Sequence, residues 1–271
     1  MSRIDNNYYN QGVYYYPQNQ DSQNSTGYYY KPRSQGSAEL GWILATAASG
    51  LIYKALPSFS NPFLKQMTKE HANNHIYEDV FKKAVQNSGL IEKGLTVVHT
   101  SNPTTDVGQG LNAYYSPSAK EIVLNTQKAS ISGFHELGHA MNNLKSKTGK
   151  FLQKLRGPGY AVAGLMGSFA LLNRQKPKGE KRNLIEVITD NCGKIAFAAM
   201  LPTVIEESMA SYKGVQMAKK AGLGEVAVKN LKKFYGKALL SYAGYALVTG
   251  LSVFAASKIM DKFTRPKKVE Y

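Results

Sequence analysis

The chain has 271 residues, enough for one large domain or two small ones, and 43% of them are hydrophobic, enough for a substantial core. The formal net charge of +16 suits an anionic partner, either lipid or nucleic acid. The single cysteine, Cys192, excludes an intramolecular disulfide and fits a reducing compartment.

The N-terminal segment differs in composition from the rest of the chain. Its first 36 residues hold eight of the eighteen tyrosines, interleaved with Asn, Gln, Ser and Gly. They contain no aliphatic run and no charged stretch followed by an apolar one, so we expect no cleavable signal peptide. This composition predicts a disordered tail over residues 1–37.

Four apolar stretches interrupt the polar sequence: 40–53, 157–173, 195–205 and 238–257. The last has twenty uncharged residues between Lys237 and Lys258, which matches a membrane-spanning helix in length and flanks. The second has seventeen and is rich in small residues, as membrane helices that pack closely are. The other two are short enough to be buried core helices. Because lysine and arginine cluster beside these stretches, the charge favours a membrane with anionic lipid, and we expect no nucleic acid.

The polar region between the first two stretches has mixed secondary structure. Residues 75–88 have the apolar spacing of an amphipathic helix, and 95–99 are β-branched and strand-like. Residues 112–115 and 121–125 follow as two short strands joined by turn formers. Residues 131–143 then read as a second amphipathic helix. This order predicts an α+β fold.

The second helix carries the sequence His135-Glu136-Leu137-Gly138-His139. Positions i and i+4 share one helix face, so both imidazoles can bind one zinc ion while Glu136 faces a water molecule on it. The spacing therefore predicts Zn²⁺ as cofactor, His135 and His139 as ligands, and Glu136 as the catalytic general base.

The run from Gly110 to Asn125 followed by FHELGHA (Phe134 to Ala140) resembles the gluzincin metallopeptidases, in particular the membrane-associated HtpX and CAAX-protease types. The resemblance implies a zincin-like core with a small sheet, an active-site helix and a glutamate helix, joined to two to four apolar helices. It implies hydrolysis of a peptide or protein substrate at a catalytic face in the cytoplasm. It also implies that an edge strand binds the extended substrate, here through Asn112, Ala113 and Tyr114.

The third zinc ligand in such families is a glutamate on a later helix, and this chain offers Glu186, Glu206 and Glu207. If 157–173 crosses a bilayer, Glu186 lies on the face opposite the histidines, whereas Glu207 follows a second apolar segment that can bring the chain back. We therefore favour Glu207 and keep the other two as alternatives. Ser211 stands where the family often has Asp, so either its hydroxyl or another group would have to orient a histidine ligand. Tyr212 is a candidate donor to the oxyanion.

Together these features predict a multi-pass membrane-associated zinc endopeptidase. The alternatives are an inactive zincin-like scaffold at the membrane and, less favoured, a basic nucleic-acid-binding protein. The expected segments, in chain order, are a tail at 1–37, an apolar helix at 38–58, the zincin core at 59–156, an apolar hairpin at 157–205, the third-ligand helix with a following helix at 206–236, a transmembrane helix at 237–258 and a basic tail at 259–271.

Overall fold

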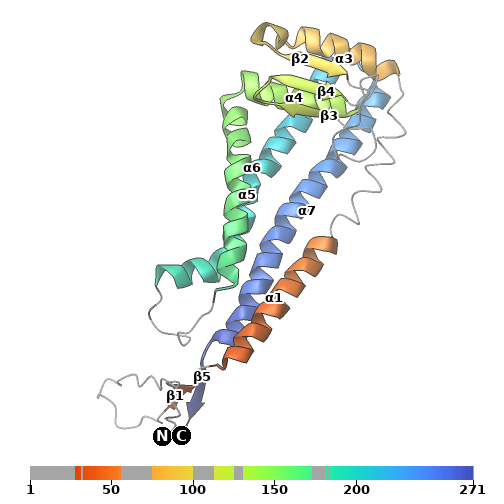
Figure 1. The fold of residues 1–271 in the computed structure, drawn as a ribbon. Helices are drawn as coiled ribbons and strands as arrows, with labels where there is room; N and C mark the ends of the chain where they lie inside the picture. Colours follow the sequence, from red (N-terminus) through yellow and green to blue (C-terminus); the bar gives the residue numbers. More distant parts are fainter. Residues whose placement is uncertain are drawn as a thin grey trace, which may run out of the picture.

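The computed structural model describes residues 28–31, 33–55, 75–99, 113–124, 131–172, 181 and 183–270. The described chain is mostly helical with one small mixed sheet, which agrees with an α+β class. Figure 1 shows a small head, formed by the sheet and the helices around it, from which long helices extend side by side as a bundle.

The sheet of the head has three strands in the order β2 (Thr96–His99), β4 (Glu121–Leu124) and β3 (Ala113–Ser116). β3 and β4 form the predicted antiparallel hairpin, in which Tyr114 lies opposite Val123. β2 runs parallel to β4. Among the described strands β3 is therefore an edge, as expected for the strand before the hairpin. Asn112 lies outside the described residues.

Two helices fill the core of the head: α4 (Ile131–Lys145), which packs on the sheet, and α3 (His75–Asn87), which packs on α4. Both confirm the apolar spacing read from the sequence. Phe81 of α3 and Phe134 of α4 are buried and meet edge to face, with their ring centroids 5.4 Å apart. Burial of the apolar face of α4 fixes this helix on the sheet. Its other faces can therefore carry the functional residues.

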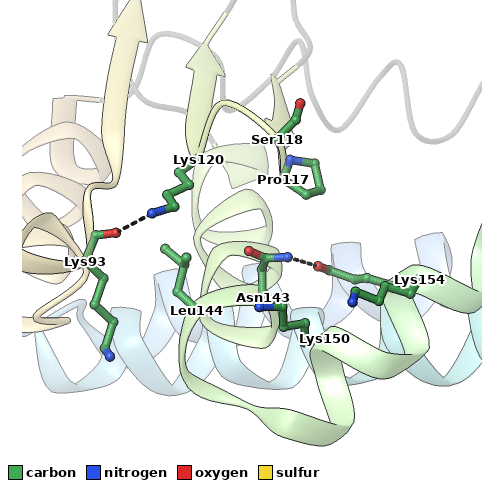
Figure 2. Close-up of a pocket in the computed structure, with 9 residues that line it drawn as sticks. Lys93, Pro117, Ser118, Lys120, Asn143, Leu144, Lys150 and Lys154 are labelled. Atoms are coloured by element: carbon green, nitrogen blue, oxygen red, sulfur yellow. Dashed lines mark hydrogen bonds between the residues drawn. The ribbon is translucent and has the colours of Figure 1, made fainter.

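A pocket of about 700 Å³ lies beside the hairpin turn (Figure 2). Its walls are the turn between β3 and β4, the short 3₁₀ helix η1 (Ile91–Lys93), the end of α4 and the start of the next helix.

The bundle consists of α1 (Gln35–Ala55), α5 (Lys147–Ala170), α6 (Leu184–Lys220) and α7 (Glu225–Thr264). The segment boundaries expected near residues 157, 206, 237 and 259 fall inside continuous helices. A change from charged to apolar residues alters the surroundings of a helix and leaves its backbone hydrogen bonds intact, so a boundary in composition need not be the end of a helix. The third-ligand segment is accordingly the middle of α6 and does not begin a helix.

The interior of the bundle is made of small residues and methionine, whereas large apolar side chains point outward. The buried set is Ala45, Ala163, Met166, Ala170, Cys192, Ala196, Met200, Ala246, Val253, Ala256 and Met260. Leu165, Leu247 and Phe254 are by contrast exposed. Soluble bundles bury their leucines, while membrane bundles place small residues at helix contacts. Among the described helices, α7 alone is long and apolar enough to cross a bilayer by length and composition.

A second, two-stranded sheet corrects the expectation of a tail without structure. β1 (Tyr28–Lys31) pairs antiparallel with β5 (Lys267–Glu270), so parts of both expected tails are strands. Tyrosine favours strands, and a partner 236 residues away along the chain is invisible to local patterns. The remainder of the expected disordered tail, up to residue 27, lies outside the described residues.

Candidate metal centre

The site forms where α4 and α6 cross with their backbones in contact. A Cβ atom placed on Gly138 of α4 would lie 2.0 Å from the carbonyl oxygen of Ala210 on α6. One placed on Gly214 of α6 would lie 2.3 Å from the carbonyl oxygen of Phe134 on α4. Glycine at both positions lets the helices approach this closely. The contact brings the histidines of α4 against the paired glutamates of α6.

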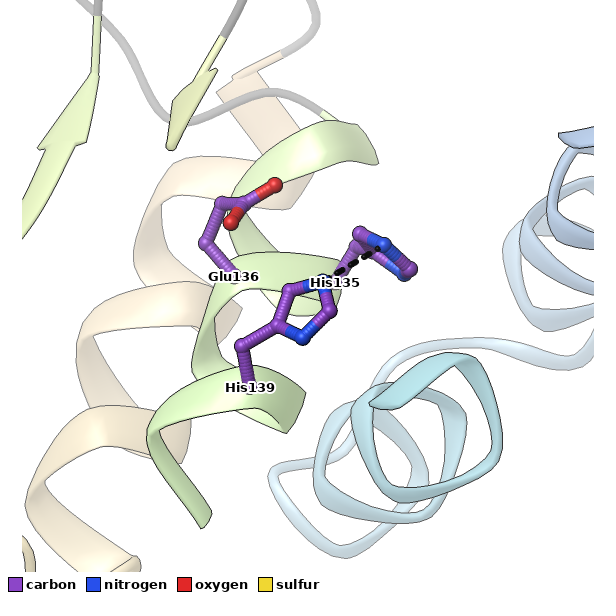
Figure 3. A group of neighbouring side chains, drawn as sticks. All are labelled: His135, Glu136 and His139. Carbon is purple, nitrogen blue, oxygen red and sulfur yellow. Dashed lines mark hydrogen bonds between the residues drawn. The ribbon is translucent and has the colours of Figure 1, made fainter. Parts of the chain in front are cut away.

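Three side-chain atoms from these helices point at one place. Nε2 of His135 lies 3.1 Å from Nε2 of His139 and 3.0 Å from Oε2 of Glu207, and the third separation, His139 to Glu207, is 3.5 Å. Ligand atoms at the usual zinc distance of about 2.05 Å in a tetrahedron are about 3.3 Å apart. The two rings of α4 lie edge to face with their centroids 4.6 Å apart, and Figure 3 shows them side by side. The three atoms therefore fit one triangular face of a zinc coordination sphere.

The opposite nitrogen of each ring is held by α6. Nδ1 of His139 lies 2.9 Å from Oε1 of Glu206, and Nδ1 of His135 lies 3.2 Å from the hydroxyl of Ser211. Such contacts fix the tautomer and orientation of a ligating imidazole and leave Nε2 for the metal. Glu206 thus sits behind a histidine, and Glu207 beside it is the glutamate that faces both rings.

Residues of α5 and α7, which the sequence reading did not single out, support the two glutamates. Arg156 donates to Oε2 of Glu206 at 3.1 Å and pairs with Oε1 of Glu207 at 2.7 Å. Gln153 donates to Oε1 of Glu206 and to the carbonyl oxygen of His139. The Tyr242 hydroxyl hydrogen-bonds Glu207. Because Arg156 holds Oε1 of Glu207, Oε2 is the oxygen turned toward the histidines.

Burial and hydrogen bonding set the charges of the group. Glu206 and Glu207 are 0% and 1% exposed, and burial alone would raise the pKa of each carboxyl. Hydrogen bonds from the histidines reverse this effect and lower both pKa values below the ordinary range. Burial would likewise lower the pKa of His139, but its bonds to the two carboxylates raise it to about 10. Without a metal the cluster therefore holds a charged histidine against two carboxylates.

Glu136 is separate from this network. Its carboxylate points to the sheet side of α4, away from the ring contact (Figure 3), and accepts a hydrogen bond from the backbone N–H of Tyr115 in β3. Burial raises its pKa above that of an ordinary glutamate. A carboxyl with a raised pKa next to a pair of imidazoles is suited to accept and return a proton.

Other residues named from the sequence lie elsewhere. Glu186 closes the capping box with Asn183 at the start of α6, 21 residues or about 31 Å along the helix from Glu207. Tyr212 is 66% exposed on α6, so its side chain does not enter the group. Ala113 is buried in β3 and Tyr114 is partly exposed on it.

The supporting residues left only faint traces in the sequence. Gln153 and Arg156 are spaced i, i+3 and so share a helix face. Arg156 also directly precedes the apolar stretch 157–173, which by itself explains a charged residue at this position. Asn142, which donates to Oε1 of Glu206 at 2.8 Å, is one turn after His139. The i, i+3 spacing from the motif is the signal that would have found it.

No protein family, curated protein or solved structure matches this chain in comparisons with known proteins. The described residues do contain a buried His-Glu-x-x-His cluster with the spacing to bind a metal ion.

Proposed function

We propose that the protein is a membrane-associated, zinc-dependent endopeptidase of the gluzincin type. The observation that supports this most strongly is the triangle of Nε2 of His135, Nε2 of His139 and Oε2 of Glu207, with sides of 3.0 to 3.5 Å. A catalytic zinc site needs three protein ligands and an open fourth position, and these atoms supply the three.

The proposed chemistry is hydrolysis of a peptide bond. Zinc, when bound, supplies Lewis acidity that activates water and polarises the scissile carbonyl. Glu136 accepts the proton of the attacking water and delivers it to the leaving amine, for which its raised pKa is an advantage. Tyr242 reaches Glu207 and is a better placed hydroxyl for the developing oxyanion than the exposed Tyr212.

The substrate is proposed to bind along β3. Among the described strands β3 is an edge, so an extended peptide can add beside it as a further strand. The N–H of Tyr115 that bonds Glu136 ties this strand to the general base. A peptide added beside Ala113 and Tyr114 therefore runs past Glu136, with side chains alternating between the protein and solvent.

The setting is proposed to be a membrane with anionic lipid, crossed by more than one helix, with the site on the cytoplasmic side. The length and apolar composition of α7 support at least one membrane-spanning helix. The outward leucines of the bundle and its interior of small residues support embedding of its other helices. α4, which carries the histidines, lies in the head at the end of the bundle (Figure 1), so an embedded bundle would put the site at the membrane surface.

Glu136→Gln in the purified full chain tests the proposal. We expect the variant to keep about one zinc per chain and to lose peptide cleavage, because the amide keeps the shape of the carboxylate and cannot take a proton. Wild-type protein and Glu186→Gln serve as active controls. Cleavage by Glu136→Gln at the wild-type rate would remove Glu136 as general base.

The same preparations separate the rival functions. An inactive scaffold predicts no cleavage by the wild type in the presence of zinc. A nucleic-acid-binding protein predicts binding that weakens steeply with salt and persists in His135→Ala.

A further inference from the structure

The pocket beside the hairpin turn is strongly basic. Lys93, Lys120, Lys150 and Lys154 line it, and no aspartate or glutamate does (Figure 2). The ion pairs among the described residues involve none of these four ammonium groups. Four uncompensated positive charges around one cavity repel each other, and an anion in the cavity would relieve this repulsion.

The backbone at Lys120 has an unusual conformation for a lysine. Lys120 has φ = 54°, and among the described residues it is the one non-glycine with a positive φ. Glycine or asparagine is the ordinary choice at such a turn position, because a Cβ is disfavoured there. Its Nζ donates to the carbonyl oxygen of Lys93 across the pocket wall, 3.3 Å away. A lysine at this position strains the turn and places an ammonium group on the pocket.

The position of the pocket along α5 indicates where the anion comes from. Lys154 and Lys150 precede Gly157, the first residue of the uncharged stretch, by about 4.5 and 10 Å along the helix axis. The polar headgroup layer on each side of a bilayer is about 5 to 8 Å thick. If the uncharged stretch lies in the hydrocarbon, the backbone of Lys154 lies at the depth of the headgroups and that of Lys150 just outside them.

We propose that this pocket binds the phosphate-bearing headgroup of an anionic lipid. Lysine ammonium groups bind phosphate as point charges, and the volume of about 700 Å³ suits a headgroup better than a lone ion. Gln153 forms part of the wall and also donates to Glu206, so the headgroup sits one side chain away from the metal site. Lipid binding here anchors the head at the membrane surface. The proposal does not depend on peptidase activity.

Binding of short-chain lipids to the full chain in neutral detergent tests this site. The probes are dioctanoyl phosphatidic acid, dioctanoyl phosphatidylcholine, inorganic phosphate and an octaglutamate peptide, with affinity measured by thermophoresis. We expect saturable binding of phosphatidic acid that weakens at least about tenfold when all four lysines become glutamine, since each lysine near an anionic lipid contributes about a fivefold effect. Phosphatidylcholine and free phosphate should bind far more weakly.

A matched variant removes the same charge elsewhere: Lys219, Lys220, Lys229 and Lys232 to glutamine, all exposed in the head. It should keep the wild-type affinity for phosphatidic acid. Equal loss in both quadruple variants would mean a general charge effect and overturn the site. Free phosphate binding as tightly as phosphatidic acid would overturn the lipid as source, and tighter binding of octaglutamate would assign the pocket to an acidic peptide.

Lys120→Gly separates binding from folding. Glycine relieves the positive φ, so the melting temperature should stay the same or rise while affinity for phosphatidic acid falls. A lower melting temperature with unchanged affinity would show that Lys120 serves the turn alone.

Discussion

Gly138→Ala perturbs the contact on which the metal centre depends. The new Cβ would lie 2.0 Å from the carbonyl oxygen of Ala210 and 2.6 Å from its carbonyl carbon. Both are backbone atoms of α6, so no side chain can rotate away. Ordinary contact begins at 3.4 Å, and α4 and α6 must therefore separate locally by up to about 1.4 Å.

This separation acts directly on the ligand triangle. His135 and His139 move with α4 and Glu207 with α6, so the 3.0 Å between His135 and Glu207 becomes up to about 4.4 Å. That exceeds the edge of about 3.3 Å for a zinc tetrahedron. We expect zinc affinity to fall at least as far as on loss of an outer-shell partner, about 10- to 100-fold. Overpacking should also lower the free energy of unfolding by about 1 to 3 kcal/mol.

Zinc affinity is measured by competition with a chelator, and folding by circular dichroism and thermal melting. The control is Gly236→Ala, because Gly236 is exposed in α7 and its Cβ would meet nothing within 4 Å. That variant should keep its zinc affinity and gain up to about 1 kcal/mol in helix stability. A folded Gly138→Ala protein with wild-type zinc affinity would refute the close-approach reasoning.

Three further predictions follow from the same geometry. Glu206→Gln should lower zinc affinity about 10- to 100-fold by weakening the hold on His139, while Glu186→Gln should leave zinc content unchanged; equal effects would contradict the assigned places of the two carboxylates. Because the pKa of His139 is raised to about 10 in the metal-free protein, its contribution to stability is complete below pH 6.5 and is lost as pH rises toward 10. Melting temperatures of the metal-free protein should therefore fall across that interval while the increase caused by zinc grows, and a flat profile would count against the His139 contacts. Leu247→Asp should sharply reduce recovery in the membrane fraction, since a charge at the centre of a span costs about 3 kcal/mol, whereas Val226→Asp in the head should be tolerated; equal recovery would argue against an embedded bundle.

The individual helices and the hairpin of the head could be predicted from the sequence, because they depend on interactions between residues that are close along the chain. The apolar spacing of α3 and α4 and the turn formers between β3 and β4 gave these elements within about two residues of their ends. The long-range parts were not readable. Pairing of β1 with β5 and the continuity of α6 and α7 depend on contacts between distant segments, which no periodicity records.

The same difference between local and long-range information applies to the residues of the metal centre. The histidines and Glu136 share one helix, so their spacing alone predicted that they cluster. Glu206 and Glu207 are neighbours about 100° apart around α6, and their different contacts depend on how that helix is rotated against α4. Arg156 directly precedes the apolar stretch 157–173, and its guanidinium joins both carboxylates. Its role depends on α5 lying beside α6, which is tertiary information.

The most direct test of the account is anomalous X-ray scattering at the zinc edge from crystals of the purified full chain. We predict one peak about 2.0 to 2.2 Å from Nε2 of His135, Nε2 of His139 and a carboxylate oxygen of Glu207, with Glu206 still on Nδ1 of His139. No peak in protein crystallised with zinc, or a metal held by Glu206 in place of Glu207, would contradict the central claim.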